Sequence, residues 1–196
     1  FPTRRSSDQL KENAPIDAPK AASILRNRKG VGEAELGLAN EMAINQFIAH
    51  HSVIFQPEKK RMWVSTAPWQ CGKYVAYDLN RIFSDSIDFN HEIYTENLTV
   101  PADSFLQQQE YQQLMTYKRL APVLRKQIKK KERLDEQTLH AFQHANPHFF
   151  YVYELLGDYY HATGQQDKAL RNWKKALLLP IPKRSESERI EHKINN

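Results

Sequence analysis

Three short segments with alternating side-chain character constrain the fold of this chain most strongly. They lie within Glu41 to Leu79, whose sequence is EMAINQFIAHHSVIFQPEKKRMWVSTAPWQCGKYVAYDL. A period of two is typical of β-strands, because successive side chains of a strand point to opposite faces. We therefore expect strands at His50 to Phe55, Met62 to Thr66 and Tyr74 to Leu79.

The connections between these segments are short and polar or proline-containing. QPEKKR separates the first two segments and APWQCG separates the second from the third. Such spacing is typical of hairpins, so the sequence predicts an antiparallel meander. Both faces of the strands carry large apolar groups, and we expect the sheet to be covered on both sides.

A helix is expected before the strands, from Asp17 to Arg28, with Asp17 as its N-cap and glycines at 30 and 32 ending it. The stretch from Glu33 to Ala49 is compatible with a second short helix or with a loop that leads into the first strand. The pattern of residues does not choose between the two.

The composition changes after the strands. Leu98 to Asp103 is typical of a linker, and Ser104 is expected to cap a long helix that runs towards Lys131, kinked or restarted at Pro122. Another helix is expected to begin at Asp135 and to end at Asn146-Pro147. The fold class is therefore α+β, with an antiparallel sheet followed by an all-α region.

The C-terminal helices resemble a single tetratricopeptide repeat, a helical pair of about 34 residues. Eight residues fall at the required spacings: Tyr153, Leu156, Gly157, Tyr160, Gly164, Ala169, Trp173 and Ala176. Small residues would let the two helices approach, aromatic residues would fill the groove, and a glycine would form the turn. One repeat cannot bury its own apolar face. We favour a helical brace for the first domain over a groove that binds a peptide of a protein partner.

Bulk composition excludes several classes of protein. The chain has 196 residues with 40% hydrophobic content, a value typical of globular proteins. Its net charge is +5, and basic and acidic residues are mixed along the sequence. The basic run from Lys126 to Arg133 contains Glu132 and no aromatic residue, so a solvated segment is favoured over a nucleic-acid site. No apolar run approaches the length of about 18 residues that a membrane span needs.

The segment from about residue 18 to residue 83 resembles the C-terminal part of the acyl-CoA:6-aminopenicillanic acid acyltransferase family. The similarity lies in His51-Ser52 followed by Val53-Ile54-Phe55, a charged turn, Trp63-Val64, and an aromatic strand ending at Tyr77-Asp78-Leu79. The resemblance implies an N-terminal-nucleophile hydrolase fold, in which two antiparallel sheets are sandwiched between helices. It also implies an autoproteolytic enzyme that transfers acyl groups or hydrolyses linear amides, acting on a small-molecule substrate and needing no cofactor.

The nucleophile of that family is a cysteine freed by self-cleavage at the start of the first strand. Cys71 is the only cysteine here, and it lies in the loop between the second and third expected strands. We expect it to be a half-buried loop thiol. The resemblance therefore places the catalytic cysteine upstream of residue 1, and predicts that this chain is an inactive C-terminal fragment. The alternative is a non-enzymatic interaction module built on the helical repeat.

The expected organisation has three parts. Residues 1–8, FPTRRSSD, match the translation of a common DNA sequencing adapter and are excluded from fold reasoning, although a disordered basic N-terminus is an alternative. Residues 9–103 form the C-terminal part of the enzyme domain. Residues 104–196 form a helical extension, with the repeat at 150–183.

Asn45, His51 and Ser52 are the candidate substrate-pocket residues, because they stand where the chain enters a strand that should border the cleft. A hydrogen-bonded core histidine is the favoured alternative for His51. His140 and His144 follow Glu136 at a spacing that could bind a metal, but a solvated helix face accounts for them better. No metal site is expected.

Overall fold

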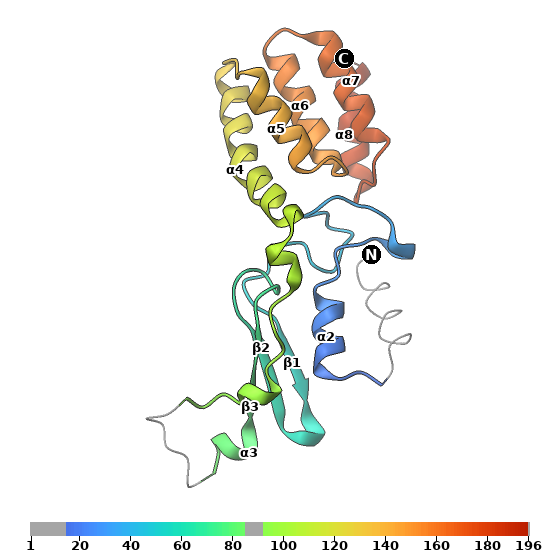
Figure 1. The fold of residues 1–196 in the computed structure, drawn as a ribbon. Coiled ribbons are helices and arrows are strands. Elements are labelled where there is room, and N and C mark those ends of the chain that lie inside the picture. Colours follow the sequence, from blue (N-terminus) through green and yellow to red (C-terminus); the bar gives the residue numbers. More distant parts are fainter. Residues whose placement is uncertain (1–14, 85–91, 196) are drawn as a thin grey trace. The chain divides into compact units, whose positions relative to one another are not determined.

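The computed structural model describes residues 15–84 and 92–195, so the adapter-like residues 1–8 lie outside the described part. The described residues contain seven α-helices and one three-stranded antiparallel sheet, an α+β arrangement (Figure 1). Two compact units are present. The sheet unit comprises residues up to 31 and residues 43–106, and the helical unit comprises residues 32–42 and 107 onwards.

The sheet unit contains the three expected strands: β1 (Val53–Gln56), β2 (Arg61–Ser65) and β3 (Tyr74–Asp78). They are antiparallel and lie in the order β1-β2-β3, with Val53 opposite Val64 and Val64 opposite Val75. A short 3₁₀ turn, Pro57–Lys59, joins the first two strands, and the four-residue helix α3 (Leu79–Ile82) follows the third. The predicted meander is confirmed.

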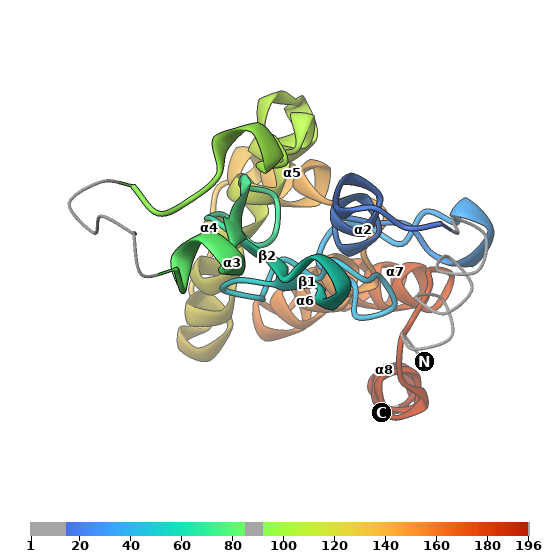
Figure 2. The ribbon, with the colours of Figure 1, turned by 90° about the horizontal axis from the view of Figure 1, so that it is seen from below.

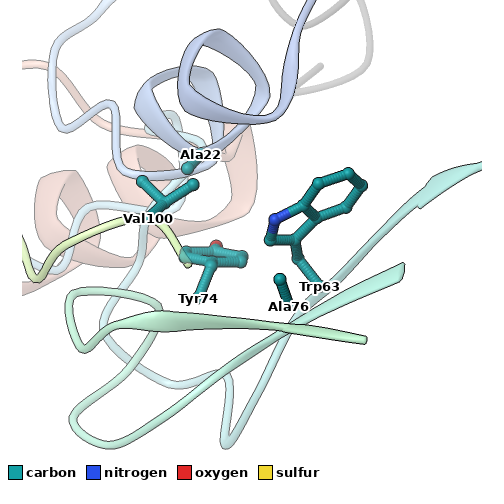
Figure 3. Close-up of a cluster of buried hydrophobic side chains, with 5 residues drawn as sticks. All are labelled: Ala22, Trp63, Tyr74, Ala76 and Val100. Atoms are coloured by element: carbon teal, nitrogen blue, oxygen red, sulfur yellow. The ribbon is translucent and has the colours of Figure 1, made fainter. Parts of the chain in front are cut away.

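One face of the sheet is covered by α2 (Ala18–Leu25). Asp17 caps this helix as expected, because its carboxylate accepts a hydrogen bond of 2.9 Å from the Lys20 backbone amide. Proline at the second helical position supports the same start. Figure 3 shows how Ala22 of α2 meets the sheet side chains in a buried cluster of Ala22, Trp63, Tyr74, Ala76 and Val100.

The opposite face of the sheet is apolar and incompletely covered. We call it the open sheet face, and six residues form it: Val53, Phe55, Met62, Val64, Val75 and Tyr77. None of these six side chains is buried, and Phe55 is 66% exposed. The expected cover on both sides is therefore present on one side only within the described residues. The reason is that α2 is a single helix and packs against one face.

The segment predicted to be a linker is instead part of the sheet unit. The backbone groups of Val100 pair with those of Tyr74 through hydrogen bonds of 2.9 and 3.0 Å, and the Val100 side chain is 6% exposed. A 3₁₀ turn at Glu96–Leu98 brings the chain to this position. The linker prediction was wrong because local composition does not show that β3 has a free edge to which a passing segment can bond.

The helical unit contains five helices: α4 (Gln109–Lys130), α5 (Glu136–Ala145), α6 (Phe150–Ala162), α7 (Gln166–Leu177) and α8 (Arg184–Asn195). Asp135 caps α5 as predicted, with a hydrogen bond of 2.7 Å from the Thr138 amide. α4 is continuous through Pro122, so of the two expected possibilities, a kink or a restart, the restart is wrong. Pro122 is exposed, where the lost backbone bond is less costly. Ser104 begins a separate 3₁₀ turn rather than capping α4.

The predicted helical pair is α6 and α7. Gly164 lies in the turn between them with a φ of 77°, a left-handed conformation that glycine adopts without strain. Six of the eight spacing residues are buried, namely Tyr153, Leu156, Gly157, Ala169, Trp173 and Ala176. Tyr160 is half-buried, and α8 was not anticipated from the sequence.

Most of the stretch from Glu33 to Ala49 has neither helix nor strand, apart from the end of a 3₁₀ turn at Val31–Glu33. Its first part belongs to the helical unit, where the Asn146 side chain bonds both backbone groups of Leu38, at 2.9 and 2.7 Å. Of the two alternatives, the structure has the loop. A side-chain amide replaces the backbone partners that a helix or a strand would have supplied.

Candidate functional site

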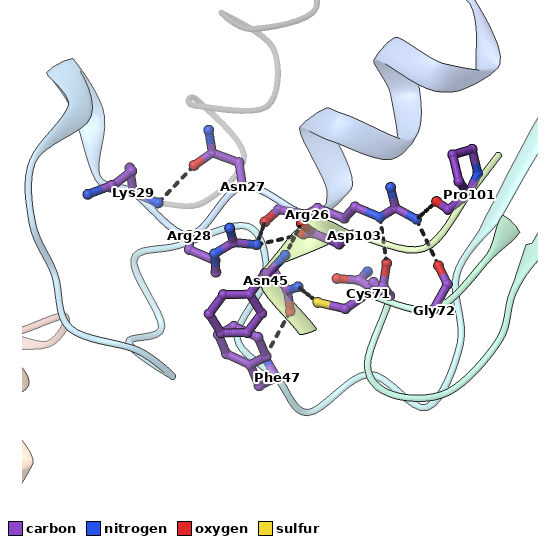
Figure 4. Close-up of polar contacts among 12 residues, drawn as sticks. Arg26, Asn27, Arg28, Lys29, Asn45, Phe47, Cys71, Gly72, Pro101 and Asp103 are labelled. Atoms are coloured by element: carbon purple, nitrogen blue, oxygen red, sulfur yellow. Dashed lines mark hydrogen bonds and ion pairs between the residues drawn. The ribbon is translucent and has the colours of Figure 1, made fainter. Parts of the chain in front are cut away.

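A polar cluster of the sheet unit is built around Arg26, the C-cap residue of α2 (Figure 4). Its Nε donates to the carbonyl of Gln70 at 3.1 Å, and one terminal nitrogen donates to the carbonyls of Gly72 and Pro101 at 2.7 and 2.8 Å. The guanidinium also lies 5.2 Å from the ring centroid of Tyr74. One side chain thus joins the end of α2 to the β2–β3 loop and to the segment that pairs with β3.

Arg28 and Asp103 form the second part of the cluster. A terminal nitrogen of Arg28 lies 2.7 Å from the Asp103 carboxylate, and the guanidinium lies 4.1 Å from the ring centroid of Phe105. The other carboxylate oxygen of Asp103 accepts a hydrogen bond from the Phe105 amide, and the Asp103 amide donates to the carbonyl of Cys71. Asp103 is therefore held between the β2–β3 loop and the start of the following turn.

Cys71 is fully buried beside this ion pair. Burial raises the pKa of its thiol, the charge of Asp103 raises it further, and Arg28, Asn45 and Arg26 only partly oppose these effects. The thiol is therefore protonated at neutral pH, and the thiolate is the form that attacks carbonyl carbons or binds metals. The expectation of a half-buried thiol underestimated its burial, while its position in the loop is as predicted.

Asn45 is the predicted pocket residue that meets Cys71. Its side-chain nitrogen donates to the Cys71 sulfur at 3.3 Å, and its oxygen accepts from the Phe47 amide at 3.0 Å. The side chain is 1% exposed, so its polar groups serve internal partners. In this state of the chain, Asn45 stabilises the loop that surrounds the thiol.

Ser52, a second predicted pocket residue, has partners other than Asn45 and Cys71. The hydroxyl of Ser52 is 2.5 Å from the Tyr74 hydroxyl, and its amide donates to the Ser65 hydroxyl at 2.7 Å. Burial raises the pKa of Tyr74, which outweighs the opposing hydrogen bond from Ser52 and the charge of Arg26. His51 is exposed, so the core-histidine alternative is wrong. His51 lies two residues before β1, outside the strand.

A hollow of about 490 Å³ lies beside the cluster, and Ser23, Arg26, Arg28, Lys29, Asp103 and Ser104 contribute to its wall. A second hollow, of about 560 Å³, is lined mainly by Phe55, Pro57, Lys60, Arg61, Leu79 and Phe83 at the end of the hairpin. The first is polar, with three cations and one carboxylate. No motif in the sequence indicated this hollow, because arginines at the C-terminal end of a helix are common: their charge interacts favourably with the negative end of the helix dipole.

The described residues contain no group of three or more His, Cys, Asp and Glu side chains placed to hold a metal. His140 and His144 stack on α5, and His144 Nδ1 lies 2.8 Å from the His140 carbonyl. Glu136 is paired instead with Lys168 at 3.4 Å. These three side chains therefore make separate contacts and do not form a common metal site.

Within residues 15–84 and 92–195, no helix has both the length and the apolar character that crossing a membrane requires.

Comparisons of the chain with models of protein families, with curated proteins and with solved structures find no match.

Replacing Arg26 with methionine is expected to lower the free energy of unfolding of the sheet unit by about 2 kcal/mol, because charged hydrogen bonds to three carbonyls are lost. The measurement is unfolding in urea, monitored through the hydrogen exchange of the β2 and β3 amides. Lys59→Met, which removes an exposed cation of the same unit, is the matched control and should change stability by less than about 0.5 kcal/mol. Equal effects of the two substitutions would contradict the role given to Arg26.

Proposed function

We propose that this chain is the C-terminal part of a cysteine N-terminal-nucleophile enzyme, an acyltransferase or linear-amide hydrolase, whose nucleophile lies on residues upstream of this sequence. The observation that carries the proposal is the open sheet face. A sheet with a helix on one side and an apolar, half-exposed surface on the other is what one half of a helix–sheet–sheet–helix sandwich presents when its second sheet is absent.

The character of the open sheet face supports this placement. Its six residues are aliphatic, aromatic or methionine, and they form a continuous surface because the strands pair in register. Large apolar patches on soluble proteins generally mark a surface that is covered by another element. β1 also lies at the edge of the sheet, and no strand of the described residues pairs with its outer side.

The state of Cys71 is compatible with a nucleophile elsewhere. In the proposed chemistry, the thiol of an N-terminal cysteine attacks the carbonyl carbon while the α-amine of the same residue takes its proton. The leaving amine or thiol receives that proton, and the resulting thioester passes its acyl group to water or to an acceptor amine. A neutral, buried thiol that accepts a hydrogen bond from Asn45 is poorly suited to the first step.

For the helical unit we propose one tetratricopeptide-like repeat, formed by α6 and α7, that serves mainly as a structural support. The support for this role is the burial of α6, of which eight residues are buried: Phe150, Val152, Tyr153, Glu154, Leu155, Leu156, Gly157 and Tyr159. In the free chain, α6 therefore leaves no continuous exposed face that could serve as an open peptide groove.

The test of the enzymatic proposal is to determine the coding sequence upstream of Gln9 and to express the extended chain. Intact-mass analysis should reveal self-cleavage that leaves a cysteine at a new N-terminus, and the product should hydrolyse an acyl p-nitroanilide or an acyl thioester. Alanine in place of the new N-terminal cysteine should abolish both. Cys71→Ser, which keeps a hydrogen-bond acceptor for Asn45, is the matched control and should retain both activities.

Two results would count against the proposal. One is a start codon directly upstream of this sequence, with no cysteine-headed strand encoded. The other is thiol-dependent turnover of the acyl substrates by the present 196-residue chain alone. In either case the alternative, a non-enzymatic interaction module, would account for the chain better.

A further inference from the structure

An acidic pair on α6 lies beneath the C-terminal helix. Glu154 and Asp158 stand four residues apart, so both side chains face the same side of α6. Glu154 is 2% exposed, which is rare for a carboxylate unless it is paired. The cover is α8, which lies at the edge of the helical unit and is seen end-on in Figure 2.

Two basic residues of α8 meet this acidic pair. Arg189 donates from Nε and from a terminal nitrogen to the two carboxylate oxygens of Glu154, both at 2.8 Å. Lys193 lies 2.7 Å from Glu154 and 2.8 Å from Asp158. A bidentate arginine and a bridging lysine give the contact defined geometry as well as charge complementarity.

The apolar contribution of α8 is small by comparison. Its sequence is RSESERIEHKIN, and Ile190 is its only buried residue. An isolated helix of 12 residues is marginal in water. The attachment of α8 therefore depends mainly on the two ion-paired side chains and on one isoleucine, and α8 has the fewest buried residues of the five helices.

The acidic site does not depend on α8 for its shape. Trp173 of α7 donates from its indole nitrogen to Asp158 at 2.9 Å, and this bond lies entirely within the α6–α7 pair. The chain leading into α8 is anchored separately, because Asn40 donates to the Pro180 carbonyl at 3.1 Å and Lys183 pairs with Glu41 at 2.6 Å. None of these three contacts involves a residue of α8.

We propose that α6 and α7 carry a docking site for a short basic helix of a partner protein, and that α8 fills this site in the free chain as an intramolecular competitor. The partner helix presents arginine, isoleucine and lysine at relative positions 0, +1 and +4, the spacing of Arg189, Ile190 and Lys193. A partner with this pattern displaces α8 and becomes attached to the helical unit. The inference does not depend on the enzymatic proposal.

Acid is expected to release α8. Burial alone raises the pKa of Glu154, but the hydrogen bonds and charges of Arg189 and Lys193 outweigh it, so the pKa in the folded chain lies below the ordinary value of 4.5. The charged groups around it are those two cations, Asp158 on α6, and Glu186 beside Arg189. Because the folded pKa is depressed, the stabilisation is complete above the ordinary value and is lost as the pH falls through the folded value. Hydrogen exchange of the α8 amides, corrected for intrinsic rates, should accelerate below about pH 4.5 relative to α6.

The docking site is tested with a fluorescein-labelled peptide of residues 183–195 and the full chain. In the double variant Arg189→Glu and Lys193→Glu, α8 is repelled from Glu154 and the site becomes free. We expect the peptide to bind this variant at least tenfold more tightly than the native chain in fluorescence anisotropy. Adding Glu154→Gln and Asp158→Asn to the variant should remove the binding. Arg184→Glu is the matched control, because the Arg184 side chain is 90% exposed and pairs with Glu188 of the same helix, and this variant should behave as the native chain.

The outcomes separate the proposal from its competitors. Equal binding to the native chain and to the double variant, or no binding to either, overturns it. The proposal is also overturned if the double variant forms dimers by exchanging α8 but does not bind the peptide. The docking site would then bind a second copy of this chain and not a partner protein. If the double variant loses helicity, the native chain is used. Excess unlabelled peptide should then accelerate exchange of α8 amides at least fivefold without changing α7, and exchange of α8 in step with α6 and α7 overturns the proposal.

Discussion

Alanine at position 157 is expected to lower the free energy of unfolding of the helical unit by about 3 kcal/mol, although alanine normally favours a helix over glycine by about 1 kcal/mol. The reason is contact: a Cβ added at Gly157 would overlap the indole ring of Trp173. That ring is 2% exposed and is held by its bond to Asp158, so it cannot move aside easily. The effect is measured by unfolding the chain in urea and monitoring the circular dichroism of the helix band.

A double-mutant cycle shows whether the overlap causes the loss. Trp173→Leu removes the overlapping ring, so Gly157→Ala should cost at least about 1.5 kcal/mol less in that background than in the native one. Gly164→Ala is the control for glycine in general. Nothing lies within 4 Å of a Cβ built there, so only the cost of its left-handed backbone, about 1 kcal/mol, is expected. A full cost of Gly157→Ala in the Trp173→Leu background would contradict the explanation.

Replacing Trp63 with alanine is expected to destabilise the sheet unit by about 4 kcal/mol, near the middle of the range for a large aromatic side chain in a core. Trp63 is 4% exposed, packs in the cluster beneath α2, and donates from its indole nitrogen to the carbonyl of Leu98 at 2.8 Å. Its loss leaves a cavity and an unpaired carbonyl. Hydrogen exchange of the β2 and β3 amides under increasing urea reports the change in this unit alone.

Phe55→Ala is the matched control, because Phe55 is an aromatic residue on the open face of the same sheet and is 66% exposed. We expect its effect to stay within about 0.5 kcal/mol. Similar losses at the two positions would mean that both faces of the sheet are covered in solution. That result would remove the main support for a missing second sheet.

Local signals in the sequence predicted most of the secondary structure. The alternation between His50 and Leu79 located all three strands, although their ends differ from the expected ones by up to three residues, as strand and helix ends generally do. Asp17 and Asp135 marked helix starts, because a carboxylate three residues ahead can bond an unpaired amide. Gly164 marked the turn between α6 and α7.

The candidate site was less predictable. Asn45 was selected because it precedes a strand, yet its observed partner is Cys71, 26 residues further along the chain. The role of Arg26 depends on carbonyls 44, 46 and 75 residues away, and no local pattern indicates such bonds. α8 was missed because it has one buried residue and is held by charges on another helix.

The sequence by itself determined where strands, helix caps and the turn of the helical pair lie, since these depend on side-chain periodicity and on bonds between residues a few positions apart. Only the tertiary structure decided that α2 covers one face of the sheet and that six apolar residues form the open sheet face. It also decided that a buried carboxylate on α6 holds α8. These features depend on which segments contact one another after the chain has folded. Burial and charge pairing arise from those contacts and are not properties of any single segment.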